Sequence, residues 1–164
     1  MAVQLARIAE LALVTLDRPE VLNALDAALL RELDAAFDQV ARDDTRALLV
    51  TGDRAFCAGA DINELIGRSL VATRQGALFG QAIFAKLDTL LIPSIALING
   101  YAFGGGLQLA LACTFRLAAP SARLSLPEIK LGLIPGYGGT QRLLRLIGEA
   151  RAPEMILTGR SVGN

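Results

Sequence analysis

Short apolar runs alternate with amphipathic segments along most of the chain. Runs with the length of buried strands occupy residues 11–16, 47–51 and 92–98. Each is short, continuous and bounded by turn-forming or charged residues, as expected of a strand buried in a sheet. Residues 26–41 instead place large apolar side chains at spacings of four, four and three, namely Leu29, Leu33, Phe37 and Val40. This period predicts an amphipathic helix that packs against a sheet.

The same alternation continues to the end of the chain. Helical spacing predicts a helix from residue 62 that is broken near Gly67, and a longer helix over residues 70–91. Further helices are expected at 107–112, 140–147 and 153–157, and short strands at 115–118 and 123–126. The order of strands and helices predicts an α/β fold in which helices cover sheets.

Three consecutive glycines, Gly104–Gly106, follow the apolar strand at 92–98 and precede the apolar helix at 107–112. Glycine costs backbone entropy inside a regular element, so such a run needs a structural reason. At a strand-to-helix junction the usual reason is that a ligand approaches the backbone, where the first N–H groups of the helix have no internal partner. Those groups and the helix dipole favour an oxygen with negative charge. A tight turn packed against a neighbouring segment is the alternative.

A second glycine-rich segment, residues 136–139, contains Tyr137. It does not complete the G-x-G-x-x-G pattern of dinucleotide-binding proteins. Tyr101 and Tyr137 both adjoin glycine-rich turns, where a phenol could donate a hydrogen bond. Packing is the expected role of both rings.

Composition limits the chemistry that this chain can carry. Its 164 residues are enough for one domain with a core, and 53% of them are hydrophobic. The 16 basic and 16 acidic residues give zero net charge without a basic stripe, which argues against nucleic acid as a partner. The absence of histidine excludes Ser-His-Asp and Cys-His catalysis and any histidine-bearing zinc site. Acid–base chemistry therefore falls to carboxylate, Lys, Tyr or Cys side chains.

The cysteines and the apolar segments bear on the location of the protein. Cys57 and Cys113 form no Cys-x-x-Cys pair and lie in apolar surroundings, so we expect reduced core residues rather than a disulfide. No apolar run reaches the length of a membrane span, and residues 1–7 lack the features of a signal peptide. We therefore expect a cytoplasmic protein without a membrane partner.

One acidic residue has an apolar sequence environment. Glu128 lies between Pro127 and Ile129 in a leucine-rich segment. Apolar surroundings disfavour the charged carboxylate, so Glu128 is a candidate for a raised pKa. The alternative is an exposed turn in which Glu128 pairs with Lys130. Other acidic residues could be imagined as metal ligands, but we interpret them as solvated loop charges and expect no metal site. These residues are Asp53, Asp61 and Glu64.

Four segments of the chain together carry a family resemblance. They are residues 18–25, 55–62, 99–113 and 126–142. In this order and spacing they resemble the crotonase (enoyl-CoA hydratase/isomerase) superfamily over nearly the whole chain. The resemblance implies an α/β, crotonase-like spiral of repeated strand-strand-helix units in one acyl-CoA-binding domain, residues 1–164, which lacks the family's C-terminal helical part. Because residues 159–164 look like a turn, we expect the domain to continue beyond them.

The resemblance also implies roles for individual residues. The N–H groups of Ala60 and Gly105 would form an oxyanion hole for the thioester carbonyl of an acyl-CoA. Glu128 matches the family's main catalytic carboxylate, and Gly136 matches the residue whose backbone helps to hold the reacting water. The residues implied to border coenzyme A and its acyl group are Ala24, Leu25, Ala58, Ala60, Asp61, Ile62, Gly104, Gly105, Pro127 and Gly136.

Position 108 departs from the pattern of the family's hydratases. Those enzymes pair two glutamates, and the second lies three residues after the middle glycine of the run, where this chain has Gln108. An amide can hold a water molecule but cannot exchange the water's proton at neutral pH. The departure favours single-glutamate chemistry, as in the family's enoyl-CoA isomerases. A helix residue that only faces a polar neighbour is the alternative for Gln108.

The activity implied by the resemblance is that of an enoyl-CoA hydratase-like lyase, which acts on an acyl-CoA thioester through a stabilised enolate. An enoyl-CoA isomerase is one alternative, and a non-catalytic acyl-CoA-binding or scaffold subunit is another. Coenzyme A would enter as part of the substrate, with no permanently bound cofactor. The resemblance further implies a homotrimer or a dimer of trimers for the full-length form.

Overall fold

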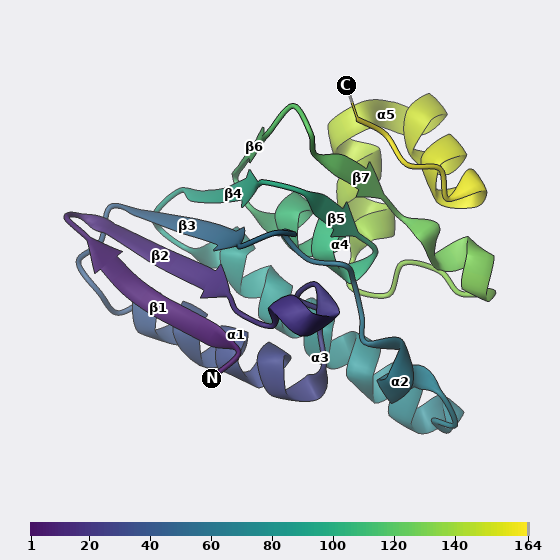
Figure 1. Cartoon of the computed structure of the whole chain (residues 1–164), viewed down its shortest axis with the longest axis horizontal. Coiled ribbons are helices and arrows are strands. Elements are labelled where there is room, and N and C mark those ends of the chain that lie inside the picture. Colours follow the sequence, from purple (N-terminus) through teal and green to yellow (C-terminus); the bar gives the residue numbers. More distant parts are fainter. Residues whose placement is uncertain (164) are drawn as a thin grey trace.

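A five-stranded sheet forms the frame of the molecule (Figure 1). The computed structural model describes residues 1–163. The strands lie in the order β1-β2-β3-β4-β6. Their bounds are β1 Val3–Ile8, β2 Leu11–Leu16, β3 Ala47–Gly52, β4 Ser94–Ile98 and β6 Phe115–Ala118. The β1–β2 pair is antiparallel and the other pairs are parallel, because helices connect the parallel neighbours.

A second, smaller sheet lies beside the first. Strand β5 (Tyr101–Phe103) pairs in parallel with β7 (Arg123–Ser125), and an isolated parallel bridge joins Cys57 to Ala102. After β3, β4 and β6 the chain therefore passes from the larger sheet into the smaller one, and helical segments follow each passage. This path confirms the predicted spiral of strand-strand-helix units.

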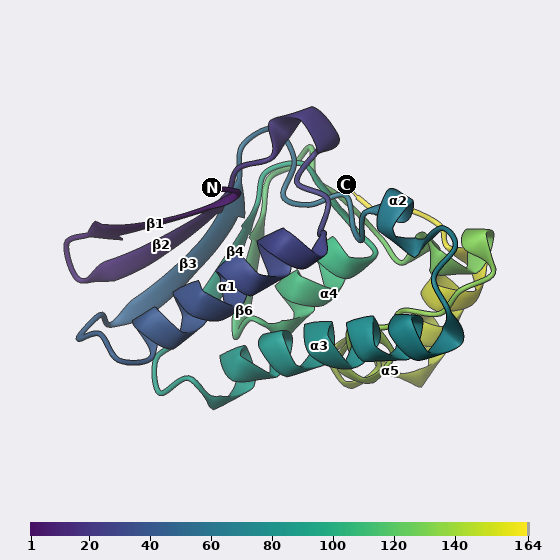
Figure 2. The ribbon, with the colours of Figure 1, turned by 90° about the horizontal axis from the view of Figure 1, so that it is seen from below.

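Helices cover one face of the larger sheet. Figure 2 shows α1, α3 and α4 side by side on that face, and they are Ala27–Val40, Leu70–Thr89 and Gly105–Ala112. The remaining helical segments are the 3₁₀ turns η1 (Pro19–Val21) and η2 (Pro127–Leu131) and the helices α2 (Ile62–Leu65) and α5 (Gly139–Thr158). Segments α2, η2 and α5 lie at one end of the molecule (Figure 1), and the candidate site there is lined by residues of α2, α3, α4 and η2.

The core forms where the helices meet the sheet. The predicted apolar stripe of α1 is buried, with Leu29, Leu33, Phe37 and Val40 at most 2% exposed. Helix α4 is buried along its whole length, which accounts for its apolar sequence on every side. As predicted, both cysteines are free and buried, and burial raises the pKa of the Cys57 and Cys113 thiols to about 12.

The structure differs from the sequence-based expectation at several element boundaries. Strand β1 has no predicted counterpart, because it is an edge strand in which only Val3 is buried. Strand β5 has three residues, too few for a recognisable pattern. Helix α4 begins at Gly105, two residues earlier than predicted. Helix α5 spans both of the helices expected at 140–147 and 153–157, and non-helical geometry at Gly148, with a φ of 82°, separates its two helical parts, so that the second begins earlier than expected. Within residues 1–163, no helix is long and apolar enough to span a membrane.

Gly106 lies where the first turn of α4 touches the backbone of Cys57. A Cβ atom at Gly106 would overlap the Cys57 carbonyl oxygen and lie 2.7 Å from the Cys57 Cβ. We expect Gly106→Ala to lower the free energy of unfolding by about 3 kcal/mol, which is at the upper end of the usual cost of adding a group to a closely packed site. Gly76→Ala in α3 is the control, because its added Cβ meets only the flexible end of Arg68. Urea denaturation measures both variants, and an unchanged stability of Gly106→Ala would contradict this packing.

Candidate functional site

The N-terminus of α4 borders a cavity. Gly104, the residue before the helix, has a φ of 49°, a conformation that favours glycine. Gly104 and Gly105 both line the cavity. The first N–H groups of a helix have no acceptor within the helix, and the N–H of Gly105 finds none elsewhere in residues 1–163. The glycine run thus presents a free backbone donor at the cavity.

A second backbone donor comes from the loop between β3 and α2. The N–H of Leu25 donates to the Gly59 carbonyl at 2.7 Å, and the N–H of Asp61 donates to the Leu25 carbonyl at 2.9 Å. These bonds hold Ala60 from both sides, while its own N–H has no acceptor in the described part of the chain. A Cβ at Gly59 would lie 3.5 Å from the Gly105 nitrogen. Ala60 and Gly105, predicted as paired donors, therefore border the same cavity.

Asn23 supports the segment that holds the Ala60 loop. Its side chain is 1% exposed, accepts from the N–H of Arg18 at 2.7 Å and donates to the Ala55 carbonyl at 2.9 Å. Its φ of 59° lies in the left-handed region, which asparagine tolerates better than most residues. Arg18 adds an ion pair with Asp26 at 2.8 Å. The hydrogen bond from Asn23 to Ala55 ties residues 18–26 to the loop that carries the second donor.

Gln108 and Glu128 are in contact beside the two donors. The Gln108 side chain is buried, and its amide oxygen accepts from the N–H groups of Tyr137 at 2.7 Å and Gly139 at 2.9 Å. Two donors on the oxygen fix the orientation of the amide. Its NH₂ group therefore faces Glu128 and donates to Oε1 at 2.8 Å. The Glu128 carboxyl group contacts Gln108 and not Lys130. The alternative interpretation, an exposed turn in which Glu128 pairs with Lys130, is therefore wrong.

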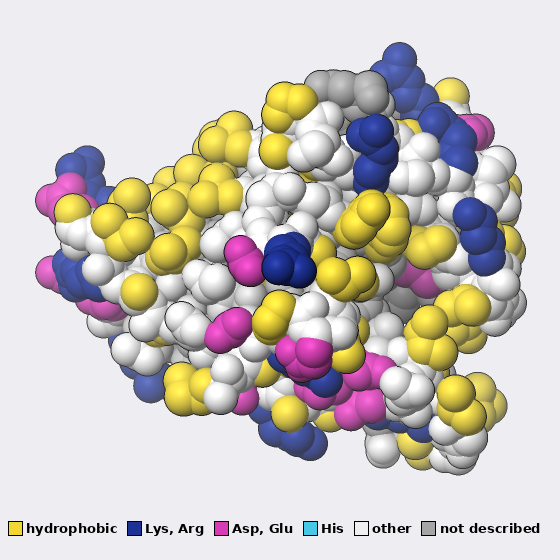
Figure 3. Space-filling model, viewed as in Figure 1, with side chains coloured by type: hydrophobic (Ala, Val, Ile, Leu, Met, Phe, Trp, Pro, Cys, Tyr) yellow, Lys and Arg dark blue, Asp and Glu magenta, His cyan; other side chains and the backbone are white. Residues whose placement is uncertain are grey.

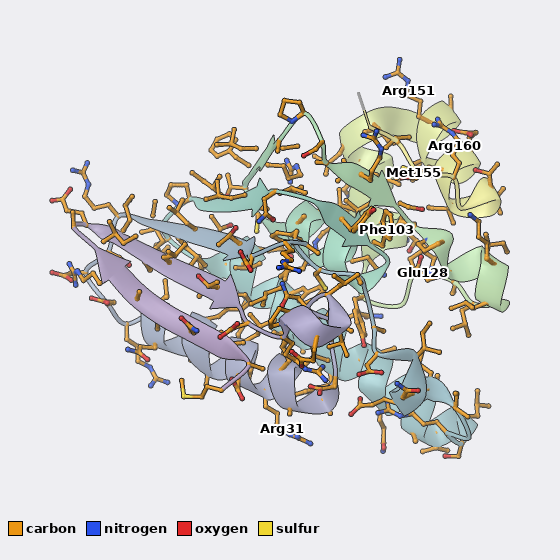
Figure 4. The ribbon with its side chains drawn as sticks, viewed as in Figure 1. Arg31, Phe103, Glu128, Arg151, Met155 and Arg160 are labelled. Atoms are coloured by element: carbon orange, nitrogen blue, oxygen red, sulfur yellow. The ribbon has the colours of Figure 1, made fainter. Side chains whose placement is uncertain are left out.

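The other oxygen of Glu128 has no partner. Oε2 is buried and finds no hydrogen-bond partner in residues 1–163. Glu128 is labelled in Figure 4, and a Cβ at Gly104 would lie 3.3 Å from its Oε1. Burial raises the pKa of the Glu128 carboxyl above its ordinary value, and hydrogen bonds from its own backbone and from Gln108 oppose the increase. Such a carboxyl group is suited to accepting and returning a proton.

These groups line one cavity of about 190 Å³. The predicted site residues on its wall are Ala58, Ala60, Ile62, Gly104, Gly105, Gln108, Pro127, Glu128 and Gly136. Ala24, Leu25 and Asp61 lie outside the wall, although Leu25 supports it from behind Gly105. The surface is hollowed at this place, with hydrophobic side chains around the hollow (Figure 3). The shape fits an apolar group that enters beside the two donors.

The acidic residues near the cavity mouth have structural partners. Asp61 accepts from the N–H of Asn63 at 3.1 Å and lies 3.6 Å from Arg18. Glu64 pairs with Arg68 at 2.9 Å. Asp53 is exposed, as expected of a solvated loop charge, whereas Asp61 and Glu64 are half-buried residues that also take part in ion pairs. Across residues 1–163, no group of three or more His, Cys, Asp or Glu side chains could hold a metal ion.

Known proteins share both the sequence pattern and the fold. The family profile described as enoyl-CoA hydratase/isomerase matches residues 7–164. A short-chain-enoyl-CoA hydratase of Clostridium acetobutylicum is 39% identical over 156 residues, 93% of this chain. An enoyl-CoA isomerase/hydratase of Zymoseptoria tritici is 46% identical over 159 residues, also 93% of this chain. The chain belongs to the enoyl-CoA hydratase/isomerase family, as the resemblance predicted.

A solved structure confirms the fold as well as the family. The crystal structure of an enoyl-CoA hydratase from Bacillus anthracis matches 99% of this chain with a TM-score of 0.94 and 42% identity. All three relatives are longer. The chain covers 60% of the Clostridium protein, 52% of the Zymoseptoria protein and 64% of the crystallised chain. It therefore spans about half to two thirds of the length of these relatives.

Sequence reasoning alone did not identify every residue that shapes the site. The sequence analysis includes Asn23 only within the matching segment 18–25 and assigns it no role. Its left-handed backbone conformation, which distinguishes it, is known only from the structure. Tyr137 was expected to pack, and it does, but it also lines the cavity. Leu131 and Ile134 line the cavity too, and no periodic pattern in that segment points to them.

The raised pKa of Glu128 predicts a pH-dependent effect on stability. Below the ordinary carboxyl pKa, Glu128 is protonated in both folded and unfolded chains. As pH rises toward and through the raised pKa, ionisation favours the unfolded chain, and folded stability is lost. Glu128→Gln removes this loss, so its stability relative to the unchanged protein should be greater at about pH 8 than at about pH 4.

Urea denaturation of both proteins at the two pH values measures that difference. The control is Glu149→Gln, because Glu149 is exposed and its charge remains in water in both states. A stability difference for Glu128→Gln that is constant with pH, or larger in acid, would contradict the burial of an ionisable Glu128.

Proposed function

We propose that this protein acts on an acyl-coenzyme A thioester and binds the thioester carbonyl at the N–H groups of Ala60 and Gly105. The observation that carries the proposal is that two backbone donors without acceptors and the Glu128 carboxyl group border one cavity. When the α-carbon of a thioester loses or gains a proton, negative charge develops on the carbonyl oxygen. Each fixed donor in such a site stabilises that charge by roughly 3–4 kcal/mol.

Hydration of an enoyl-CoA, a lyase reaction, is the first candidate. Glu128 would take a proton from water while the water oxygen bonds to the β-carbon. The electrons of the carbon–carbon double bond then move to the carbonyl oxygen, and the α-carbon of the resulting enolate receives the proton from Glu128. The backbone at Gly136 is on the cavity wall, where it could hold the water. The name of the Clostridium relative supports this reaction.

Isomerisation of an enoyl-CoA is the second candidate, and the contact of Gln108 with Glu128 favours it. A neutral amide occupies the place where a second carboxyl group would be needed for two-carboxylate hydration. Glu128 alone could remove a proton from one carbon and return it to another, with the enolate held in between. The Zymoseptoria relative carries both activities in its name. A non-catalytic role would leave the unpartnered Glu128 oxygen without a use.

Glu128→Gln tests whether this carboxyl group moves protons. An amide of the same shape keeps the hydrogen bond from Gln108 but cannot accept the proton. We expect turnover of crotonyl-CoA to fall by about 10²–10⁴-fold, while binding of butyryl-CoA, measured by calorimetry, survives. The control is Glu149→Gln on α5, which should retain activity. Full turnover by Glu128→Gln would rule out the assignment.

Gln108→Glu tests whether the amide at this position limits hydration. One oxygen of the new side chain can accept from Tyr137 and Gly139, as the amide oxygen does now. The other would face Glu128 Oε1, and two carboxyl groups so close shift each other's pKa values apart. Hydration should then rise while isomerisation changes less.

Loss of enoyl-thioester absorbance and a parallel isomerisation assay distinguish the two reactions. Gln108→Leu is the control, because it removes the amide without adding a carboxyl group. If the unchanged protein already hydrates crotonyl-CoA as fast as Gln108→Glu does, Gln108 is a group that positions water and not a functional departure.

A further inference from the structure

Tyr137 forms a fixed wall of the cavity beside the donor glycine. A Cβ at Gly105 would lie 3.1 Å from the ring carbons Cδ2 and Cε2, and a Cβ at Gly80 would lie 2.5 Å from Cδ1. Phe84 meets the ring edge-on, with centroids 5.6 Å apart. The backbone N–H of Tyr137 is bonded to Gln108. The ring is therefore held between α3 and α4 at the wall of the cavity.

The two glycines that flank the ring belong to different helices. Gly80 lies within α3 and Gly105 begins α4. Glycine inside a helix costs roughly 0.5–1 kcal/mol relative to alanine, and at Gly80 an added Cβ would overlap the ring. Gly80 is thus a place where the fold gives up helix stability to admit a large aromatic side chain at the cavity wall.

The position of the ring decides how far an acyl chain can extend. A carbonyl oxygen bound at Ala60 and Gly105 places the α- and β-carbons near Glu128, which borders Gly104. We expect carbons beyond these to meet the Tyr137 ring, because the ring packs on the same Gly105 and lines the same cavity. The cavity of about 190 Å³ is also smaller than the roughly 300–1,000 Å³ of pockets for drug-sized ligands.

We propose that Tyr137 restricts this site to short acyl groups, such as crotonyl and butyryl, by closing the space next to Gly80 and Phe84. The proposal rests on the proposed function, since it takes an acyl thioester as the ligand. It makes Tyr137 a specificity-determining residue through its ring, with no role for its hydroxyl group in length selection.

Calorimetric binding of butyryl-, hexanoyl- and octanoyl-CoA tests the proposal without requiring turnover. The unchanged protein should bind butyryl-CoA most tightly, because longer chains have no room to be buried. Tyr137→Ala should reverse this order. Each pair of added methylene groups should then tighten binding by about tenfold, the gain expected for burying them. Tyr137→Phe should keep the original order, since the ring remains.

Two further variants and one control keep the proposal testable if Tyr137→Ala does not fold. Tyr137→Leu removes less volume and should shift the preference in the same direction. Ala77→Leu adds bulk from α3, where Ala77 lines the cavity 3.7 Å from the Cβ position of Gly136. It should weaken hexanoyl-CoA more than butyryl-CoA. Tyr101→Ala changes the other tyrosine, which is 46% exposed and off the cavity wall, and should leave the order unchanged.

The outcomes separate this proposal from the proposed function. If the unchanged protein binds octanoyl-CoA as tightly as butyryl-CoA, or if folded Tyr137→Ala and Tyr137→Leu keep the original order, the role of Tyr137 is overturned while acyl-CoA binding stands. If the unchanged protein binds no acyl-CoA of any length, the proposed function fails and this inference fails with it.

Discussion

The contact between the start of α4 and the loop after β3 is the constraint on which the site depends. The N–H of Cys57 donates to the Tyr101 carbonyl at 2.9 Å, and the N–H of Phe103 donates to the Cys57 carbonyl at 3.0 Å. This short parallel ladder places the loop against the glycine run, where the absence of a Cβ at Gly106 allows the two backbones to touch. Two donors from distant parts of the sequence can then border one cavity.

A buried amide connects this backbone frame to the carboxyl chemistry. Gln108 bonds to two N–H groups of the second glycine-rich turn and to Glu128. Its oxygen and its NH₂ group both have partners, and a buried polar group is tolerated when its hydrogen bonds are made. Within residues 1–163, two buried side-chain oxygens have no partner: Glu128 Oε2 at the cavity, and Thr45 Oγ1 between α1 and β3. Glu128 Oε2 and the N–H groups of Ala60 and Gly105 thus leave polar atoms at the cavity that a ligand can meet.

The sequence predicted the features that depend on local pattern, and it missed those that depend on distant contacts. The stripe of α1 and the buried helix after the glycine run follow directly from apolar spacing. Edge strand β1 buries too little to produce a pattern, and β5 is too short to do so. At the site, the roles of Glu128 and Ala60 came from family resemblance. The orientation of Gln108 and the wall formed by Tyr137 arise only when the two glycine-rich turns meet.

The central claim is that the N–H groups of Ala60 and Gly105 bind a thioester oxygen, and amide NMR spectroscopy tests it most directly. Butyryl-CoA and free coenzyme A would be titrated separately into ¹⁵N-labelled protein, since only the former carries the carbonyl group. A hydrogen bond to an oxygen moves an amide proton resonance downfield. We predict that butyryl-CoA moves the resonances of both Ala60 and Gly105 downfield and that free coenzyme A does not. If the two ligands give the same shifts at these residues, or if neither resonance moves when butyryl-CoA binds, the account is contradicted.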